Sequence, residues 1–160
     1  MAGMEMSTAR IGGWLLPVVP KDWELIEPHG IRRTGKGIFP SNASFTEEPL
    51  PGGKDLASYV QDQVAGLRRM ISEVVVVEQS PSAFPDSDDA QQLVMRFHVE
   101  GRPIVQRQMY VFRGGMIGIL TLTTTEQDVE TVRGAFDRMR ESARYCPESS
   151  LPVATEDPAE

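Results

Sequence analysis

The sequence has few of the residues that form disulfides or metal sites, and it has no long apolar segment. Among its 160 residues there is one cysteine, Cys146, and there are two histidines. A single cysteine permits neither an internal disulfide nor a zinc site built on cysteines. No apolar run approaches the roughly 18 residues of a membrane span. Bases are also few, 16 against 23 acids, for a net charge of −7. That balance argues against a nucleic-acid binder, because such a domain needs a positive surface to neutralise phosphates.

Export signals are missing as well. The stretch from Met1 to Gly13 places Glu5 before any basic residue and holds no apolar segment, whereas a secretory signal needs a positive start and then ~7–15 apolar residues. We therefore expect a cytoplasmic chain with a flexible N-terminus over residues 1–13. Residues 147–160 hold acids, no base and no periodicity. They are expected to form a disordered acidic tail, with an acidic interaction tail as the alternative. A single domain over residues 14–146 remains.

Two segments carry helical periodicity. Between Lys54 and Met70 the apolar residues recur every three or four positions, with acids toward the start and two arginines at the end, as the helix dipole favours. A second stripe with the same spacing runs from Glu126 to Ala143, and Thr125 is placed to cap its first turn. Both segments are predicted to be amphipathic helices that pack on a sheet.

Strand patterns fill most of the remaining sequence. Alternating residues and β-branched runs predict strands at 14–19, 43–46, 74–77, 93–99, 104–112 and 116–123. Glycine turns separate the last three, and short turns join only antiparallel neighbours, so these three form a β-meander. The strand at 116–123 is apolar on both faces and should be covered on both sides or lie at an interface. The predicted fold is α+β, an antiparallel sheet with helices packed on it.

Residues typical of catalysis or metal binding are sparse. His29 and His98 have no third ligand at a compatible spacing. No nucleophile elbow is present. Cys146 follows the end of a predicted helix, where the dipole disfavours a thiolate. We therefore expect no enzyme, no metal and no other cofactor.

Two groups of basic residues are candidates for an anion-binding site. The loop from Gly30 to Gly37 combines glycines with three bases, as a phosphate cradle does. No helix begins after it, which favours a solvated loop. The second group is Arg96, Arg102 and Arg107, which surround one hairpin. They either receive a carboxylate or simply make a polar sheet face.

Several short segments stand in an order that is typical of one family. They are Pro20–Trp23, Asn42–Phe45 before a proline-rich turn, Leu56–Val60 with Gln63, Gly101–Pro103 continuing to Gln106–Gln108, and Leu120–Thr125 followed by a helix that contains Phe136. On these segments the chain resembles the DcrB family from Trp23 to about Arg144. The resemblance implies the Mog/PsbP-like fold, an antiparallel sheet between helices.

Within that family the sequence resembles the Eag chaperones of type VI secretion, which bind the N-terminal transmembrane helices of effectors before export. The resemblance implies a non-enzymatic chaperone or adaptor, a homodimer, and a secreted effector with a hydrophobic N-terminal segment as its partner. Neither nucleic acid nor stable membrane insertion is expected. An apolar sheet face suits this task, because it can hide helices that are insoluble in water. The alternative function is a small-molecule- or anion-binding domain.

The strand at 104–112 divides its residues between the two sheet faces. The even positions are Ile104, Gln106, Gln108, Tyr110 and Phe112; the odd positions are Val105, Arg107, Met109 and Val111. We expect the closing helix to cover the odd, more aliphatic set. The predicted client-binding residues are Ile104, Tyr110 and Phe112, joined by Ile38 and Phe45. The alternative is that these side chains belong to the core.

Overall fold

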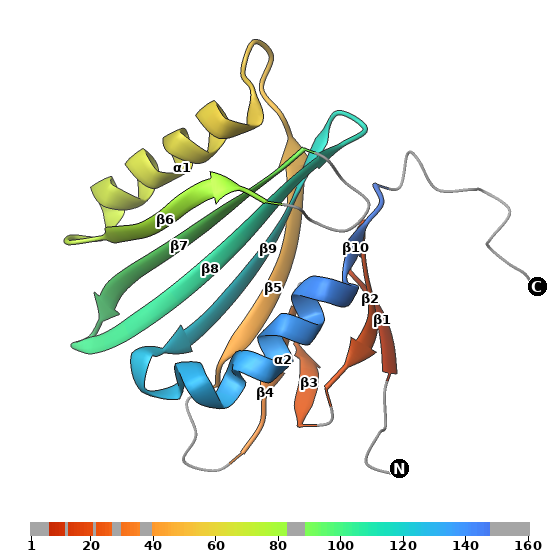
Figure 1. Cartoon of the computed structure of the whole chain (residues 1–160), viewed down its shortest axis with the longest axis vertical. Coiled ribbons are helices and arrows are strands. Elements are labelled where there is room, and N and C mark those ends of the chain that lie inside the picture. Colours follow the sequence, from red (N-terminus) through yellow and green to blue (C-terminus); the bar gives the residue numbers. More distant parts are fainter. Residues whose placement is uncertain are drawn as a thin grey trace, which may run out of the picture.

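A long antiparallel sheet forms the centre of the molecule (Figure 1). The computed structural model describes residues 7–11, 13–20, 22–26, 30–35, 40–82 and 89–147. The elements are β1 (Ser7–Ile11), β2 (Trp14–Val19), β3 (Trp23–Ile26), β4 (Gly30–Arg33), β5 (Asn42–Pro49), α1 (Leu56–Met70), β6 (Val75–Pro81), β7 (Ala90–Val99), β8 (Arg102–Arg113), β9 (Met116–Thr125), the 3-10 turn η2 (Glu126–Asp128), α2 (Val129–Ser142) and β10 (Arg144–Tyr145). A seven-stranded sheet has the order β3-β4-β5-β9-β8-β7-β6, and a three-stranded sheet has the order β1-β2-β10.

The predicted meander of β7, β8 and β9 is confirmed. Each strand pairs with the next in an antiparallel register over its length. Glu100 and Gly101 make the first turn, and Gly114 and Gly115 make the second, with φ values of 63° and 79° for this glycine pair. Glycine adopts this left-handed backbone without a steric cost, which is why the strands can reverse so tightly.

The two helices cover opposite faces of the sheet. Four residues of α1 are buried against one cluster of apolar side chains on β7, β8 and β9; they are Leu56, Tyr59, Val60 and Val64. In α2, Val132 and Met139 are buried in a second cluster, together with side chains of β2, β5 and β9. We name the two sheet surfaces the α1 face and the α2 face. The predicted α+β fold, with helices packed on an antiparallel sheet, is confirmed.

Local signals begin both helices where the sequence predicts. The Asp55 carboxylate accepts a hydrogen bond from the backbone N–H of Ser58 at 2.8 Å, and α1 begins at the next residue after Asp55. The Thr125 hydroxyl accepts one from the N–H of Asp128 at 3.1 Å, so the predicted N-cap is confirmed, although it caps the turn η2 that leads into α2. In both places the side chain satisfies a backbone donor that has no partner within the helix.

The strand β9 contributes buried side chains to both faces of the sheet, although its α1 face is covered only in part. Ile117 contributes to the cluster under α1, whereas Leu120 and Leu122 contribute to the cluster under α2. Alternating side chains of one strand therefore join two cores, and β9 is the central strand of the seven-stranded sheet, with three strands on each side. The helix α2 packs on one face of β9, whereas on the α1 face Ile117 is buried and Ile119, Thr121 and Thr123 are half-buried.

The N-terminal part differs from the expectation. Residues 7–11, expected to be flexible, form β1 and pair antiparallel with β2. Trp23, which lies outside the predicted strands, begins β3 and pairs with Arg33 of β4. Each of these strands pairs with the next strand along the chain, β1 with β2 and β3 with β4. The predicted disordered tail lies outside the described residues apart from Pro147.

Candidate functional site

The helix α1 leaves part of its sheet face open. It contacts β7 and β8 and lies toward the β6 edge of the sheet (Figure 1). Beyond it, the same face continues across β9 and β5, where the side chains are polar and neither fully buried nor fully exposed. They are Gln106 and Gln108 of β8, Thr121 and Thr123 of β9, and Asn42 and Ser44 of β5. We name these six residues the polar strip.

Cross-strand hydrogen bonds order the polar strip. The Gln106 side-chain amide donates to the Thr123 hydroxyl at 3.1 Å, and the Gln108 amide donates to the Thr121 hydroxyl at 3.5 Å. The Tyr110 hydroxyl donates to the carbonyl oxygen of the Gln108 side chain. An amide or hydroxyl held this way still has capacity for further hydrogen bonds. The strip therefore offers an ordered row of donors and acceptors on a sheet surface.

An apolar hollow lies at one end of the strip. It has a volume of about 410 Å³ and is lined by Phe97, Val99, Glu100, Arg102, Ile104, Gln106 and Thr123. A second hollow of about 560 Å³ shares Phe97 and Ile104 with the first and continues past the start of β6. Val99, in the lining of the first hollow, is 48% exposed. We name the first of these the hairpin hollow, because it lies at the β7–β8 turn.

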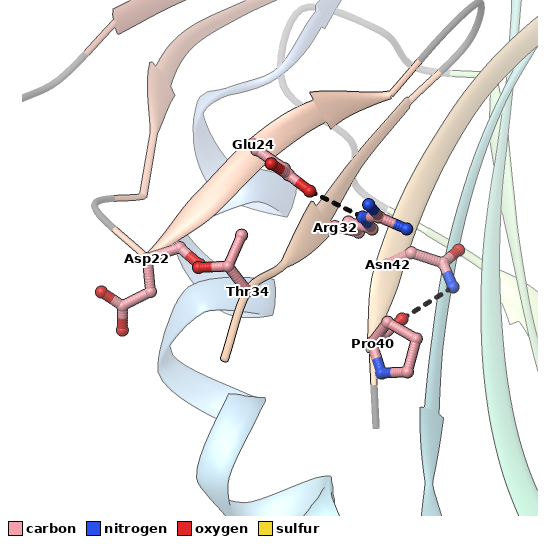
Figure 2. A network of polar contacts seen from close by, with 6 residues as sticks. All are labelled: Asp22, Glu24, Arg32, Thr34, Pro40 and Asn42. Atoms are coloured by element: carbon pink, nitrogen blue, oxygen red, sulfur yellow. Dashed lines mark hydrogen bonds and ion pairs between the residues drawn. The ribbon is translucent and has the colours of Figure 1, made fainter. Parts of the chain in front are cut away.

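The other end of the strip is charged. Arg32 of β4 lies opposite Asn42 of β5 on one side and opposite Glu24 of β3 on the other. The Arg32 Nε lies 2.8 Å from a carboxylate oxygen of Glu24, and the Asn42 amide donates to the backbone oxygen of Pro40 at 3.2 Å (Figure 2). The α1 face thus passes from an apolar hollow, through amides and hydroxyls, to an exposed ion pair.

The structure separates the residues predicted to bind a client. Ile104 and Tyr110 are 4% and 1% exposed and belong to the core under α1, and Phe112 packs against the same core. Phe45 is 1% exposed but lies on the α2 face, with its ring centroid 5.8 Å from that of Trp14. The expected grouping of Phe45 with Tyr110 is therefore wrong. Ile38 lies outside the described residues. Whether any of these residues contacts a client stays a prediction.

The predicted division of β8 is confirmed. Met109 and Val111 of the odd set lie in the core with Val132 and Met139 of α2.

Tyr110, in the even set, is held neutral by its surroundings. Burial raises the pKa of the Tyr110 hydroxyl above its usual range, with a smaller contribution from the Glu48 carboxylate. Tyr110 therefore stays neutral and remains a hydrogen-bond donor to the polar strip.

The three arginines around the hairpin do not form one cluster. Arg96 and Arg107 lie on the α2 face, whereas Arg102 lies on the α1 face at the hairpin hollow. The Arg96 guanidinium lies 2.8 Å from the Glu126 carboxylate. Strand parity separates these side chains, because the face of a strand alternates at every residue.

Within the described ranges, no group of three histidine, cysteine, aspartate or glutamate side chains is arranged to hold a metal ion. The same ranges contain no helix that is long and apolar enough to cross a membrane. Cys146 is half-buried and forms no disulfide.

Sequence reasoning missed the two residues that make the hollow apolar. Phe97 and Val99 alternate with His98 on β7, and that alternation marks a strand. The alternation does not show that Val99 lies beyond the part of the sheet on which α1 packs. The sequence feature that indicates the hairpin hollow is the turn at Gly101, because a tight turn places the neighbouring residues at the exposed end of the hairpin.

Comparisons with known proteins agree with this architecture. The family model of DcrB matches residues 32–142. Among solved structures, the chain is similar to PA94 from Pseudomonas aeruginosa, a protein of unknown function described as a candidate regulator: 19% identity, 84% of this chain and 92% of that one covered, TM-score 0.62. No curated protein sequence matches the chain.

Two further structures identify the fold. The cyanobacterial PsbP of Synechocystis sp. PCC 6803 is 17% identical, with 88% of this chain and 94% of that one covered and a TM-score of 0.57. The Ran-binding protein Mog1p of Saccharomyces cerevisiae is 7% identical, with 92% and 100% covered and the same TM-score of 0.57. The predicted Mog/PsbP-like fold is confirmed.

Proposed function

This chain belongs to the DcrB family, and we propose that it is a non-enzymatic binding protein that shields N-terminal transmembrane segments of type VI secretion effectors. The proposal combines a sequence resemblance with one structural observation. The open part of the α1 face joins an apolar hollow to an ordered row of amides and hydroxyls. The proposed client lies across this surface as a helix.

The chemistry of such a client matches both parts of the surface. Apolar side chains of a transmembrane helix are removed from water when they enter the hairpin hollow beside Phe97 and Ile104. Transmembrane helices also carry serine, threonine or asparagine that bond to neighbouring helices in the membrane. Outside the membrane, Gln106 and Gln108 supply amides for those same groups. The polar strip thus supplies the hydrogen bonds that neighbouring helices would supply in the membrane.

The charged end of the surface suits the end of a client helix. Residues that flank a transmembrane segment are frequently charged, since they lie at the membrane surface. The exposed pair of Arg32 and Glu24 offers both signs of charge to such a flank.

The oligomeric state is a separate part of the proposal. A homodimer, which the resemblance implies, remains a prediction that sedimentation analysis tests directly.

The test uses one exposed residue of the hairpin hollow. The client is the N-terminal segment of an effector encoded beside this chain, co-expressed with it as a tagged fusion. Val99→Glu places a carboxylate where the apolar helix is proposed to lie, and desolvating it should weaken capture at least about tenfold. Val77→Glu is the matched control, because Val77 is similarly exposed at 54% and lies outside the lining of both hollows.

Because Val99 and Val77 are both exposed, neither change should disturb the core. Equal capture by wild type, Val99→Glu and Val77→Glu would contradict the proposed surface. Failure of the wild-type chain to retain the effector segment in solution would contradict the proposed function itself.

A further inference from the structure

The strand β7 extends beyond its neighbour β6 at the β7–β8 turn. β6 pairs with β7 only as far as Val75, which lies opposite Arg96, whereas β7 pairs with β8 as far as Val99 (Figure 1). The three residues from Phe97 to Val99 therefore have β8 on one side and, among the described residues, no strand on the other. We name that other side the free edge.

The backbone of His98 faces the free edge. At the opposite end of β7, the carbonyl oxygen of Ala90 accepts a hydrogen bond from the N–H of Ser82, on the β6 side. Every second residue of a strand faces the same way, so His98, eight positions after Ala90, also faces that side. No backbone hydrogen bond joins Phe97, His98 or Val99 to the described residues there. An unpaired N–H and C=O at a strand edge can accept a further strand.

The second hollow lies against the free edge. Its volume of about 560 Å³ is in the range of ligand-binding clefts, roughly 300–1,000 Å³. Its lining includes Phe97 and Ile104 from the α1 face, and Arg96 and His98 from the α2 face. Side chains from both faces meet at one hollow where a sheet has an edge. A strand added at that edge would contact both sets, since its own side chains alternate between the two faces.

The charged side chains around the free edge favour a basic partner. In the lining of the second hollow, Arg96 pairs with Glu126 at 2.8 Å, whereas Glu73 forms no ion pair with any residue that the structure describes. The hairpin hollow adds one charge of each sign, from Glu100 and Arg102. The two linings together therefore leave the exposed carboxylate of Glu73 to attract a positive charge.

We propose that the free edge binds the extended flank of the client's transmembrane segment, which adds to the sheet as a strand opposite His98. This proposal rests on the proposed function. The hairpin hollow and the second hollow share Phe97 and Ile104, so a client that leaves the first hollow enters the second. The other possible occupant, a second copy of this chain, is an outcome of the test below.

Pairing at the free edge defines the chemistry of the flank. The residue opposite His98 exchanges two backbone hydrogen bonds with it, and the two neighbours of that residue lie opposite Phe97 and Val99 on the α1 face. These neighbours are apolar, whereas the residue between them is lysine or arginine, which Glu73 attracts. Basic residues are common beside transmembrane segments on the cytoplasmic side.

The probe is the peptide acetyl-Lys-Val-Lys-Val-Lys-amide, added to the full chain at physiological ionic strength. Amide hydrogen exchange at His98 is followed by NMR. For so short a peptide we expect a Kd on the order of 1 mM, and at ten times the Kd exchange at His98 should slow about tenfold. The same peptide with an N-methylated central lysine lacks the N–H that pairs with His98, and should bind at least about tenfold more weakly. Acetyl-Glu-Val-Glu-Val-Glu-amide should also bind more weakly.

Two exposed glutamates give a matched pair of variants. Glu73→Lys should weaken binding of the basic peptide at least about threefold. Glu141→Lys changes the net charge equally, at an exposed residue of α2 outside both linings, and should leave binding unchanged. Thermal unfolding of both variants checks that they are folded. Equal binding of the N-methylated or the acidic peptide, or equal effects of the two variants, would overturn the proposal.

The capture assay separates this proposal from the chaperone function. Replacing the residues that flank the effector's apolar segment by glycine and serine should weaken capture at least about threefold and remove the protection of His98. Capture without protection of His98 would overturn strand addition and leave the chaperone proposal intact. Protection of His98 in the chain alone that disappears on dilution would assign the free edge to a second copy, and would also overturn the proposal.

Discussion

The carboxylate of Glu47 joins two sheets through a hydrogen bond from the hydroxyl of Tyr145. The two residues lie 98 positions apart in the sequence, and their oxygen atoms are 2.8 Å apart. The other carboxylate oxygen of Glu47 accepts from the backbone N–H of Gly13 at 3.0 Å. Glu47 belongs to β5 of the large sheet, whereas Tyr145 belongs to β10 of the small one. One carboxylate thus satisfies donors from both ends of the described chain.

Glu47→Ala should destabilise the fold, because two donors at a largely buried junction lose their acceptor. We expect the free energy of unfolding to fall by about 2–3 kcal/mol in urea titrations. Glu48→Ala is the control: Glu48 is exposed and lies on the opposite face, so its loss should change stability by less than about 0.5 kcal/mol. Equal effects of the two substitutions would refute the structural role of Glu47.

Gly118→Ala tests how closely the Tyr145 ring lies on β9. A Cβ at Gly118 would lie 2.5 Å from two ring carbons of Tyr145, and that ring also packs on Trp14 with its centroid 5.1 Å away. The ring has no free side to move to, so we expect a loss of about 2–3 kcal/mol, as for other overpacked cores. Gly52→Ala, which meets no atom within 4 Å, should be nearly neutral in the same urea titration.

Tyr110→Glu should unfold the domain rather than report on client binding. The side chain is 1% exposed, and its ring lies edge-on to that of Tyr59 with centroids 5.9 Å apart. A carboxylate placed there would be buried near the negative charge of Glu48, and we expect the loss to exceed about 4 kcal/mol. Tyr110→Phe keeps the ring and should cost about 1 kcal/mol, from the lost bond to Gln108. A folded Tyr110→Glu protein in circular dichroism would contradict the burial.

Alkaline pH should weaken the fold through two tyrosines. Burial raises the pKa of Tyr110; burial, helped by the hydrogen bond to Glu47, also raises that of Tyr145. A raised folded pKa gives stability that is fully present below the unfolded value of about 10 and is lost as pH rises beyond it. Each tyrosine should contribute a decline of at most about 1.4 kcal/mol per pH unit.

Urea titrations between about pH 8 and pH 11 measure this decline. Tyr110→Phe and Tyr145→Phe should each flatten the dependence, since phenylalanine does not ionise. Other groups titrate in the same range, so the comparison is made between each variant and the wild type. An identical slope in all three proteins would show that neither hydroxyl is held neutral by the fold.

The sequence by itself determined the local elements. Helical periodicity and caps placed α1 and α2, and residue alternation placed β7, β8 and β9, since these patterns depend on residues within a few positions of each other. The parity of β8 also separated Tyr110 and Ile104 from Met109 and Val111 without any knowledge of the partners. The family resemblance then indicated the Mog/PsbP-like architecture.

Only the tertiary structure decided how the separate strands share their faces. Phe45 and Tyr110 fall on opposite sides, because the pairing of β5 with β9 and of β9 with β8 fixes the relative parity of these strands. That register is set by contacts between distant segments, and a shift of one residue would reverse it. The same long-range pairing brings Glu47 to Tyr145. No local pattern encodes such relations, because they arise only when whole strands and helices pack together.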